Sequence, residues 1–228
     1  MSVAYQWDFS FLWQYRGLLL SAMKITALLW LISLSAGMSV GLLIAAARLS
    51  PNRLLRWGGR LFTECFRNVP GIVLIFWFFY AIPVLTGLQA SVWLSSIVAL
   101  SLYAAAYCSE IYRSGILALP QGQWHAASAL GMSLWQQFWL VILPQAVRHM
   151  IPAFANRAIE LVKNTTLASA LAVGELLYTT KLVAQEQFRP LEAYTAVALM
   201  FTLLILPCSL LALHLERRVR QEHPRSTS

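Results

Sequence analysis

The length of its uncharged stretches constrains this chain most. Residues 25–47, between Lys24 and Arg48, are 23 uncharged residues rich in Leu, Ala and Ile, and residues 193–215 are 23 more. A helix rises ~1.5 Å per residue, so each run reaches ~35 Å, enough for a ~30 Å hydrocarbon core. With 59% hydrophobic and only 11% charged residues, the chain is expected to be an all-α polytopic membrane protein.

A third run is too long for a single span. Residues 68–109 are 42 consecutive uncharged residues, and one helix of that length would reach ~63 Å, about twice the bilayer. Pro83 and Gly87 are helix breakers near its middle, so the run is expected to turn back there. The sequence therefore predicts one transmembrane domain over residues 1–228, a helical bundle of about five spans: 18–47, 70–84, 91–110, 145–168 and 193–215.

The basic residues predict the orientation of these spans. Of the 17 Lys and Arg residues, eleven fall on one side: Arg48, Arg53, Arg56, Arg60, Arg67, Arg113, Arg148, Arg217, Arg218, Arg220 and Arg225. Cytoplasmic loops carry an excess of Lys and Arg, so this side is expected to be cytoplasmic, with the C-terminus on it and the N-terminus outside. Five of these arginines, from Arg48 to Arg67, are expected to lie in a short cytoplasmic loop after the first span. The same rule accounts for the net charge of +8, and nucleic-acid binding is not expected.

Metal and catalytic signatures are not found in the sequence. Cys65, Cys108 and Cys208 are far apart and lie in or beside apolar segments, which is typical of packing thiols. No HExxH motif, Ser/His/Asp set or Cys/His cluster is present, so neither an enzyme nor a metal site is expected. The histidines are scattered: His125, His149, His214 and His223.

Two glycines in the first span are spaced for helix packing. Gly37 and Gly41 form a small-xxx-small pair, which lets a second helix approach closely. Glycines are also common in membrane spans without a specific contact, and the sequence leaves both interpretations open.

A polar stretch, QGQWHAASALGMSLWQQ at residues 121–137, lies between the third and fourth spans on the cytoplasmic side. Its apolar residues recur at helical spacing and predict a stripe against the membrane bundle: Trp124, Ala127, Leu130 and Leu134. Gly131 is expected to end a helix, and Ser133 to cap a second one. We expect two short helices bent at Gly131 with a polar face left free; the alternative is a plain connector.

The fourth predicted span carries ionisable residues. Arg157, Glu160 and Lys163 recur at i, i+3 and i+6, with Asn156 and Asn164 beside them. A charge at mid-bilayer is unfavourable unless it is paired or faces water. One interpretation is a self-neutralising helix face. The other is the lining of a substrate path, because an amino acid carries an ammonium and a carboxylate and needs both signs close together.

The polar stretch resembles the EAA motif, EAA-x3-G-x9-I-x-LP, of the membrane subunits of bacterial ABC importers. The matching residues are His125, Ala126, Ala127, Gly131, Val141, Leu143 and Pro144, with Gln123 ending a run, 105–123, that resembles AYxAEIxRAGIxSIPxGQ. FRNVP at residues 66–70 and the segment 142–169 resemble the same proteins. The resemblance is to the polar amino-acid permeases of the histidine/glutamine/glutamate type, and it covers residues 17–220.

The resemblance implies a permease of the type I ABC importer fold in the bacterial inner membrane, which translocates polar or charged amino acids. Residues 120–144 would be the cytoplasmic loop that docks on a dimer of ABC ATPase subunits. It also implies a second permease copy or a sister permease, and a periplasmic amino-acid-binding protein. His125 departs from the motif, which has Glu at this place, and so removes an acid from the docking surface.

The chain has no G-x-x-x-x-G-K-[ST] sequence, so no bound cofactor is expected and ATP would be used by the partner subunit. The alternative function is a stand-alone secondary transporter or channel for small polar solutes. Such proteins usually have more spans, an internal repeat or broken helices in matching halves.

Overall fold

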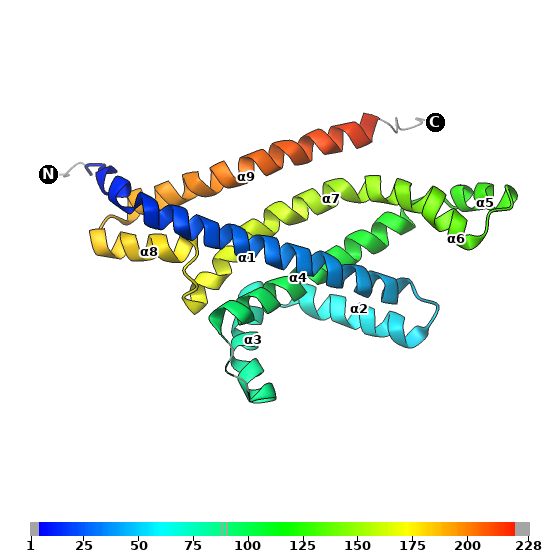
Figure 1. Cartoon of the computed structure of the whole chain (residues 1–228), viewed down its shortest axis with the longest axis horizontal. Helices are drawn as coiled ribbons and strands as arrows, with labels where there is room; N and C mark the ends of the chain where they lie inside the picture. Colours follow the sequence, from blue (N-terminus) through cyan, green and yellow to red (C-terminus); the bar gives the residue numbers. More distant parts are fainter. Residues whose placement is uncertain (1–4, 88, 90, 222–228) are drawn as a thin grey trace. The chain divides into compact units, whose positions relative to one another are not determined.

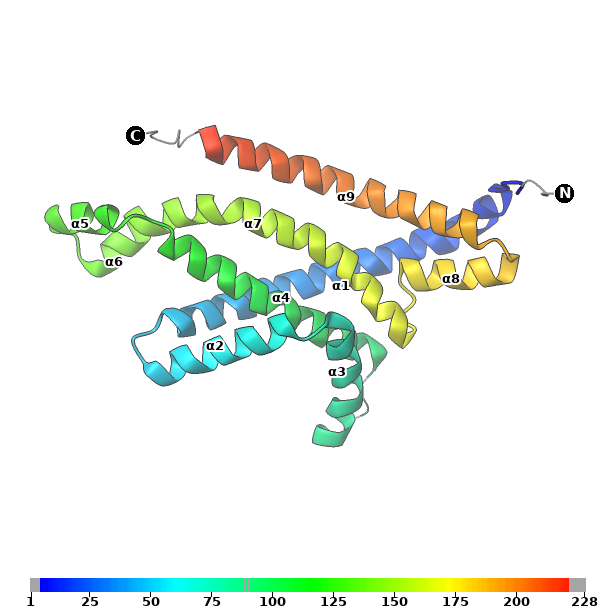
Figure 2. The same ribbon diagram turned by 180° about the vertical axis from the view of Figure 1, so that it is seen from behind.

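The computed structural model describes residues 5–87, 89 and 91–221, and the side chains of 215–221 are outside this description. Within these residues every regular element is a helix (Figures 1 and 2). The elements are α1 (Ser10–Leu49), α2 (Arg53–Asn68), α3 (Gly71–Thr86), α4 (Val92–Leu117), α5 (Gln121–Ala129), α6 (Leu134–Gln136), η1 (Gln137–Ile142), α7 (Leu143–Asn164), η2 (Thr165–Leu171), α8 (Leu176–Gln187) and α9 (Pro190–Gln221).

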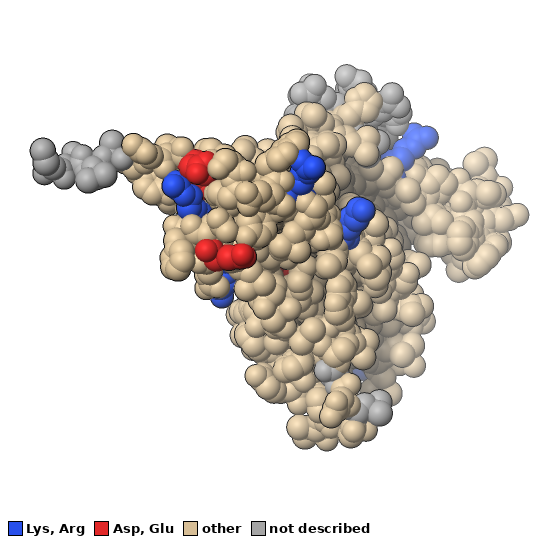
Figure 3. All heavy atoms as spheres, turned by 60° about the vertical axis from the view of Figure 1, so that its left-hand side comes forward, with Lys and Arg blue, Asp and Glu red and all other residues tan. Residues whose placement is uncertain are grey.

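The described helices supply four or five candidate membrane spans. Four are long and apolar enough to cross a membrane: Ser10–Leu49, Val92–Leu117, Leu134–Leu171 and Pro190–His214. A fifth is obtained if α2 and α3, which meet at a bend of 109°, form one broken span. The prediction of an all-α protein with about five spans is confirmed to this extent. On the face shown in Figure 3, charged side chains are few and most of the surface is uncharged.

One part of the sequence interpretation was wrong. The arginine-rich segment after residue 48 was expected to be a loop, but most of it is the 16-residue helix α2. The Asn52 side chain caps this helix by accepting a hydrogen bond of 2.9 Å from the Leu54 N–H, and such caps satisfy an otherwise unpaired donor. The helix ends where Val69 becomes extended before Pro70, a conformation that a following proline favours.

The chain forms two compact units, each assembled from three segments. One contains Met1–Ser33, Pro70–Leu100 and Leu161–Leu206, and the other contains Leu34–Val69, Ser101–Glu160 and Pro207–Ser228. The single domain over residues 1–228 stays a prediction, as does the orientation of the termini. Of the basic residues used to predict that orientation, Arg225 and the side chains of Arg217, Arg218 and Arg220 lie outside the described part.

In the first unit, α8 packs on the N-terminal half of α1. Leu19 and Ala22 of α1 are buried against Leu176 of α8. A hydrogen bond of 3.0 Å joins the same surfaces, with the Leu176 N–H donating to Thr26 Oγ1. Apolar packing therefore determines where α8 lies along α1, and the buried hydrogen bond between Leu176 and Thr26 makes this position more specific.

Glu175 begins α8 and is completely buried. Its carboxylate accepts hydrogen bonds of 3.0 Å from the Leu177 N–H and 2.7 Å from the Tyr178 N–H. Burial raises the pKa of Glu175 from its ordinary 4.5 to about 7, against the two backbone donors, which lower it. This carboxyl group therefore takes up a proton close to neutral pH.

In the second unit, α1 and α4 touch through their backbones. A Cβ added at Gly41 would lie 2.7 Å from Cys108 Cβ and 2.9 Å from the Ala105 carbonyl oxygen. At Gly37 it would lie 2.5 Å from Ala104 Cβ. Of the two interpretations of Gly37 and Gly41, the structure therefore supports the specific contact, in which they allow α1 and α4 to approach closely.

A charged network closes the same interface. Arg48 of α1 is 8% exposed, and its Nη2 lies 2.7 Å from Glu110 Oε2 of α4. Glu110 also pairs with Arg113, one turn later. Arg48 Nη1 donates to Ser109 Oγ at 3.4 Å, and this hydroxyl lies 3.1 Å from Thr63 Oγ1 of α2. The network joins three helices and leaves both oxygens of Glu110 paired.

Gly41→Ala is expected to destabilise the chain, although Ala normally stabilises a helix interior by ~1 kcal/mol relative to Gly. The new methyl group would meet atoms of α4 closer than van der Waals contact allows. Thermal unfolding of the detergent-purified protein measures this effect. Gly58→Ala in α2 is the matched control, because a Cβ there has open space. Equal or higher stability of Gly41→Ala would contradict the close packing.

The pKa of Glu175 predicts a pH dependence of stability. Below pH 4.5 both the folded and unfolded states carry the proton, whereas between 4.5 and about 7 the folded state retains it longer. The free energy of unfolding should therefore fall as pH rises through this window, by on the order of a few kcal/mol. Thermal unfolding at pH 5 to 8 should show this slope in the wild type and lose it in Glu175→Gln. The same slope in both proteins would exclude Glu175 as its source.

Candidate functional site

The polar stretch between α4 and α7 forms a helical hairpin. Gly131 has a φ of +73°, which glycine adopts without strain. Two backbone hydrogen bonds close the end of α5: the Gly131 N–H donates to Ser128 O at 3.0 Å and the Met132 N–H donates to Ala127 O at 3.2 Å. This paired arrangement is the Schellman motif. The predicted bend at Gly131 is confirmed, and Figure 1 shows α5 and α6 beside one another.

The second helix of the hairpin begins at the predicted cap. Ser133 Oγ accepts a hydrogen bond of 3.3 Å from the Gln136 N–H, and Gln136 Oε1 accepts one of 2.9 Å from the Ser133 N–H. This reciprocal pair is a capping box, which satisfies two donors that a helix start leaves unpaired. Both ends of the turn are therefore fixed by their own hydrogen bonds.

The apolar stripe predicted along the hairpin is only half correct. Ala127 is buried and Trp124 packs against a cluster formed by Leu119, Ile142, Ala146 and Met150. Leu130 and Leu134, however, are 81% and 76% exposed, and Trp135 is 71% exposed. Helical spacing puts residues on one side of a continuous helix, but α5 ends before Leu130, which is its C-cap, and Leu134 follows the turn at Gly131, so neither residue continues the buried side. The free face of the hairpin is therefore apolar as well as polar.

The structure places the remaining motif residues around this hairpin. His125 and Ala126 are exposed on α5, Leu143 is half-buried and Pro144 is exposed at the start of α7. Gln123 lies near α7, where its Oε1 accepts a hydrogen bond of 3.2 Å from Gln145 Nε2. The hairpin and the start of α7 thus present the motif as one connected surface.

Gln137 is a residue that the sequence interpretation missed. Its side chain is buried, and its Nε2 donates to Ser128 Oγ at 3.0 Å and to the Met132 carbonyl oxygen at 2.7 Å. One side chain therefore ties the end of α5 to the residue after the Gly131 turn. Gln137 also begins η1, a π-helical turn, and such turns are rare and frequent at functional sites. No spacing rule marks a side chain that bridges a turn, so this role of Gln137 could not be predicted from the sequence.

The polar residues of α7 do not all lie in one compact unit. Asn156, Arg157 and Glu160 belong to the second unit, and Lys163 and Asn164 belong to the first. Arg157 Nη1 lies 2.8 Å from Glu160 Oε2, which confirms the expected pairing one turn apart. Arg157 is 3% exposed, whereas Glu160, Asn156 and Lys163 are exposed.

Two tyrosines of α4 contact the Arg157 guanidinium group. Its central carbon lies 4.7 Å from the centroid of the Tyr103 ring and 4.1 Å from that of Tyr107. A guanidinium over aromatic rings is attracted by their negative faces, and more strongly when water is excluded. The Tyr107 ring also lies 5.2 Å from the guanidinium carbon of Arg67, so two positive charges converge on one ring.

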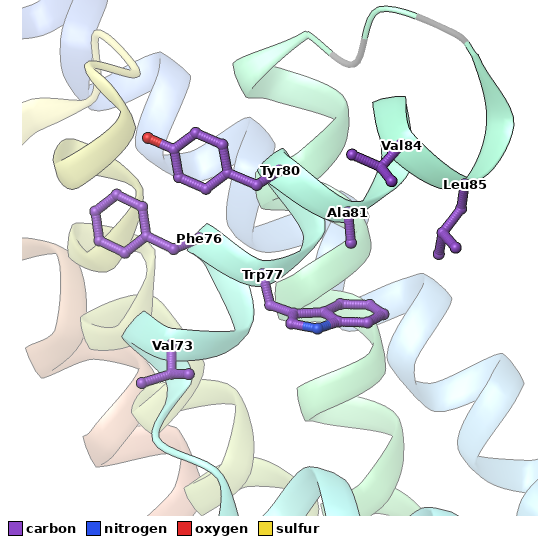
Figure 4. Close-up of a pocket in the computed structure, with 7 residues that line it drawn as sticks. All are labelled: Val73, Phe76, Trp77, Tyr80, Ala81, Val84 and Leu85. Carbon is purple, nitrogen blue, oxygen red and sulfur yellow. The ribbon is translucent and has the colours of Figure 1, made fainter.

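In the other unit, one side of α3 is an exposed apolar surface. A shallow hollow of about 590 Å³ is lined by residues of this helix alone. Among these residues, Phe76 and Tyr80 point to one side of α3 and Trp77 to the other (Figure 4). The Phe76 and Tyr80 rings are stacked with their centroids 6.4 Å apart. Val84 is 84% exposed. An apolar helix face of this kind requires a lipid or protein neighbour.

Comparison with known proteins supports the resemblance inferred from the motif. Residues 37–221 match the family described as "Binding-protein-dependent transport system inner membrane component". The probable amino-acid ABC transporter permease protein YckA of Bacillus subtilis is 38% identical over 176 residues, 77% of each chain. The glutamine transport system permease protein GlnP of Escherichia coli K12 is 31% identical over 216 residues, 94% of this chain and 99% of its own.

A solved structure shares the fold. The crystal structure of an amino acid ABC transporter with histidines contains a chain that superimposes with a TM-score of 0.88 at 27% sequence identity. The match covers 94% of this chain and 100% of the other.

Gln137→Leu is expected to loosen the α5–α6 hairpin without unfolding the protein. The substitution keeps the side-chain volume and removes both hydrogen bonds of the bridge, each of which contributes ~1 kcal/mol. Amide hydrogen exchange between residues 121 and 136 should become about tenfold faster, while the melting temperature changes little. Gln121→Leu, at an exposed position of α5, is the control. Unchanged exchange in Gln137→Leu would show that the bridge does not hold the hairpin.

Proposed function

Because the chain belongs to the inner membrane components of binding-protein-dependent transport systems, and is thus a transport subunit rather than an enzyme, we propose that it carries an amino acid across the bacterial inner membrane. The names of its relatives support the substrate class, since they are amino-acid and glutamine permeases aligned over most of the chain. The solved transporter of the same fold was crystallised with histidines. In this proposal the N-terminus is outside and the C-terminus cytoplasmic.

The α5–α6 hairpin is proposed as the surface that docks on the ATPase subunits with which this family works. The observation that carries this proposal is the turn at Gly131, closed on both sides by hydrogen bonds and bridged by Gln137. When the ATPase subunits move, a rigid hairpin of this kind passes their displacement on to α7 instead of deforming. Its exposed Leu130, Leu134 and Trp135 suit insertion into a groove, where aromatic and apolar residues form the centre of interfaces.

His125 is exposed beside this apolar group. An imidazole in place of a carboxylate offers a hydrogen bond and an aromatic surface instead of a permanent negative charge. Docking in this chain therefore depends on apolar contact more than on an ion pair. ATP would be bound by the partner subunits, and this chain would need no cofactor.

The apolar surface of α3 supports a second permease, either another copy of this chain or a sister subunit. Four or five spans are too few to enclose a solvated route by themselves, and a neighbour placed on Phe76, Trp77 and Tyr80 would cover the hollow of about 590 Å³. The proposed route is lined from α7 by Asn156, Arg157, Glu160, Lys163 and Asn164. A periplasmic binding protein would supply the amino acid from outside.

Coupling is tested with the chain and its co-purifying ATPase subunit in proteoliposomes, with the binding protein present. Gly131→Val should lower ATP-driven uptake per ATP hydrolysed about tenfold, because a β-branched residue does not adopt a φ of +73° without strain. Gly58→Val, in α2 outside the hairpin and with open space for a Cβ, should keep uptake. Full coupling in Gly131→Val would contradict the role of the turn.

A further inference from the structure

Arg157 has two buried donors that the fold does not use. Its Nη1 pairs with Glu160 at 2.8 Å, but Nε and Nη2 are buried and form no hydrogen bond within the described part of the chain. A buried donor without an acceptor costs about 1–3 kcal/mol, and more when it belongs to a charged group. Buried polar groups in folded proteins are nearly always paired, so this arrangement requires a reason.

The two unused nitrogens are neighbours on one edge of the guanidinium plane. The N–H groups of Nε and Nη2 point in the same direction and are spaced like the two oxygens of a carboxylate, which arginine binds through two parallel hydrogen bonds. The remaining edge is turned toward Glu160. The unpaired donors, Nε and Nη2, are therefore the two that together recognise a planar anion such as a carboxylate.

The surroundings of Arg157 hold the guanidinium group without satisfying it. The central carbon of the group lies over the Tyr103 and Tyr107 rings, 4.7 Å and 4.1 Å from their centroids. Aromatic faces attract the positive charge but accept no strong hydrogen bonds in the plane of the donors. The position of the guanidinium is thus fixed before any anion binds, which reduces the entropy lost on binding.

Arg48 in the same unit shows how the fold satisfies an arginine that is purely structural. Arg48 is 8% exposed, pairs with Glu110 at 2.7 Å and donates to Ser109. Neither of its terminal nitrogens is among the buried atoms without a partner. The contrast between two nearly buried arginines in one unit argues that the free edge of Arg157 is kept for a ligand.

We infer that the Nε–Nη2 edge of Arg157 binds the carboxylate of the transported amino acid, an assignment that rests on the proposed function. Glu160 pairs with Nη1, on the opposite side of the guanidinium, and serves as its counter-ion. Both unused nitrogens are buried, so the side chains that cover them must move aside for a ligand to enter. An arginine edge of this kind recognises the carboxylate that all amino acids share and is indifferent to their side chains.

The first experiment separates this inference from the proposed function. Uptake of the twenty amino acids is measured with the wild-type chain, its ATPase subunit and its binding protein in proteoliposomes. If none of them is taken up in the presence of ATP, the proposed function is wrong. An amino acid that is taken up serves as the radiolabelled probe for the second experiment.

The second experiment measures binding of this probe to the purified permease–ATPase complex without the binding protein. The unlabelled competitors are the same amino acid and its carboxamide, which lacks the carboxylate. Arg157→Gln should weaken binding of the amino acid about 100-fold, as expected for loss of a bidentate charged pair, and should leave the already weak binding of the amide unchanged. Arg157→Lys keeps the charge but not the edge and should weaken binding about tenfold.

Arg53→Gln, which removes an exposed arginine from α2, is the control and should bind like the wild type. Thermal unfolding identifies any variant that is misfolded, and Arg157→Lys then decides, since it keeps a cation beside the two tyrosines. The inference is overturned if the wild-type complex binds no amino acid, if Arg157→Lys binds as tightly as the wild type, or if the variants weaken the acid and the amide equally. The last result would assign Arg157 to structure or to a carboxylate of a neighbouring subunit.

Discussion

An apolar environment offers a polar group no water to bind, and the rest of this structure depends on this constraint. A charge or polar group removed from water must find a partner in the protein. The chain meets this demand by joining helices: Arg48 pairs with Glu110 across α1 and α4, and the Leu176 N–H reaches Thr26 across α8 and α1. The buried atoms without a partner in the described part of the chain are the hydroxyls of Ser33, Ser95, Ser96 and Ser101 and two nitrogens of Arg157, and of these only the Arg157 nitrogens belong to a charged group.

Features that depend on the local chain were predictable from the sequence. Uncharged runs predicted the spans, glycine identified the turn at Gly131, and Ser133 identified the start of the second helix, since each depends only on residues a few positions apart. Features that depend on which other element covers a surface could not be predicted from the sequence. Helical spacing put Leu130 in a buried stripe, although it is exposed. It also gave no indication that Gln137 would bridge to Ser128.

Among the site residues, too, local features were predictable and features that depend on tertiary packing were not. The spacing of Arg157 and Glu160 was sufficient to predict their ion pair. The positions of Tyr103 and Tyr107 around Arg157 required the packing of α4 on α7, which brings together residues about fifty positions apart. The two proposed sites therefore form in different ways. The α5–α6 hairpin is a rigid element determined by nearby residues, whereas the carboxylate site at Arg157 forms only when α4 packs on α7.

The central claim is that this membrane chain moves its solute only when a separate ATPase acts on the α5–α6 hairpin. Accumulation of a radiolabelled amino acid against its gradient, in proteoliposomes holding the chain with or without its ATPase subunit, tests this most directly. The account predicts accumulation only when the ATPase subunit, the binding protein and ATP are all present. Accumulation by the chain alone, driven by an ion gradient, would contradict it.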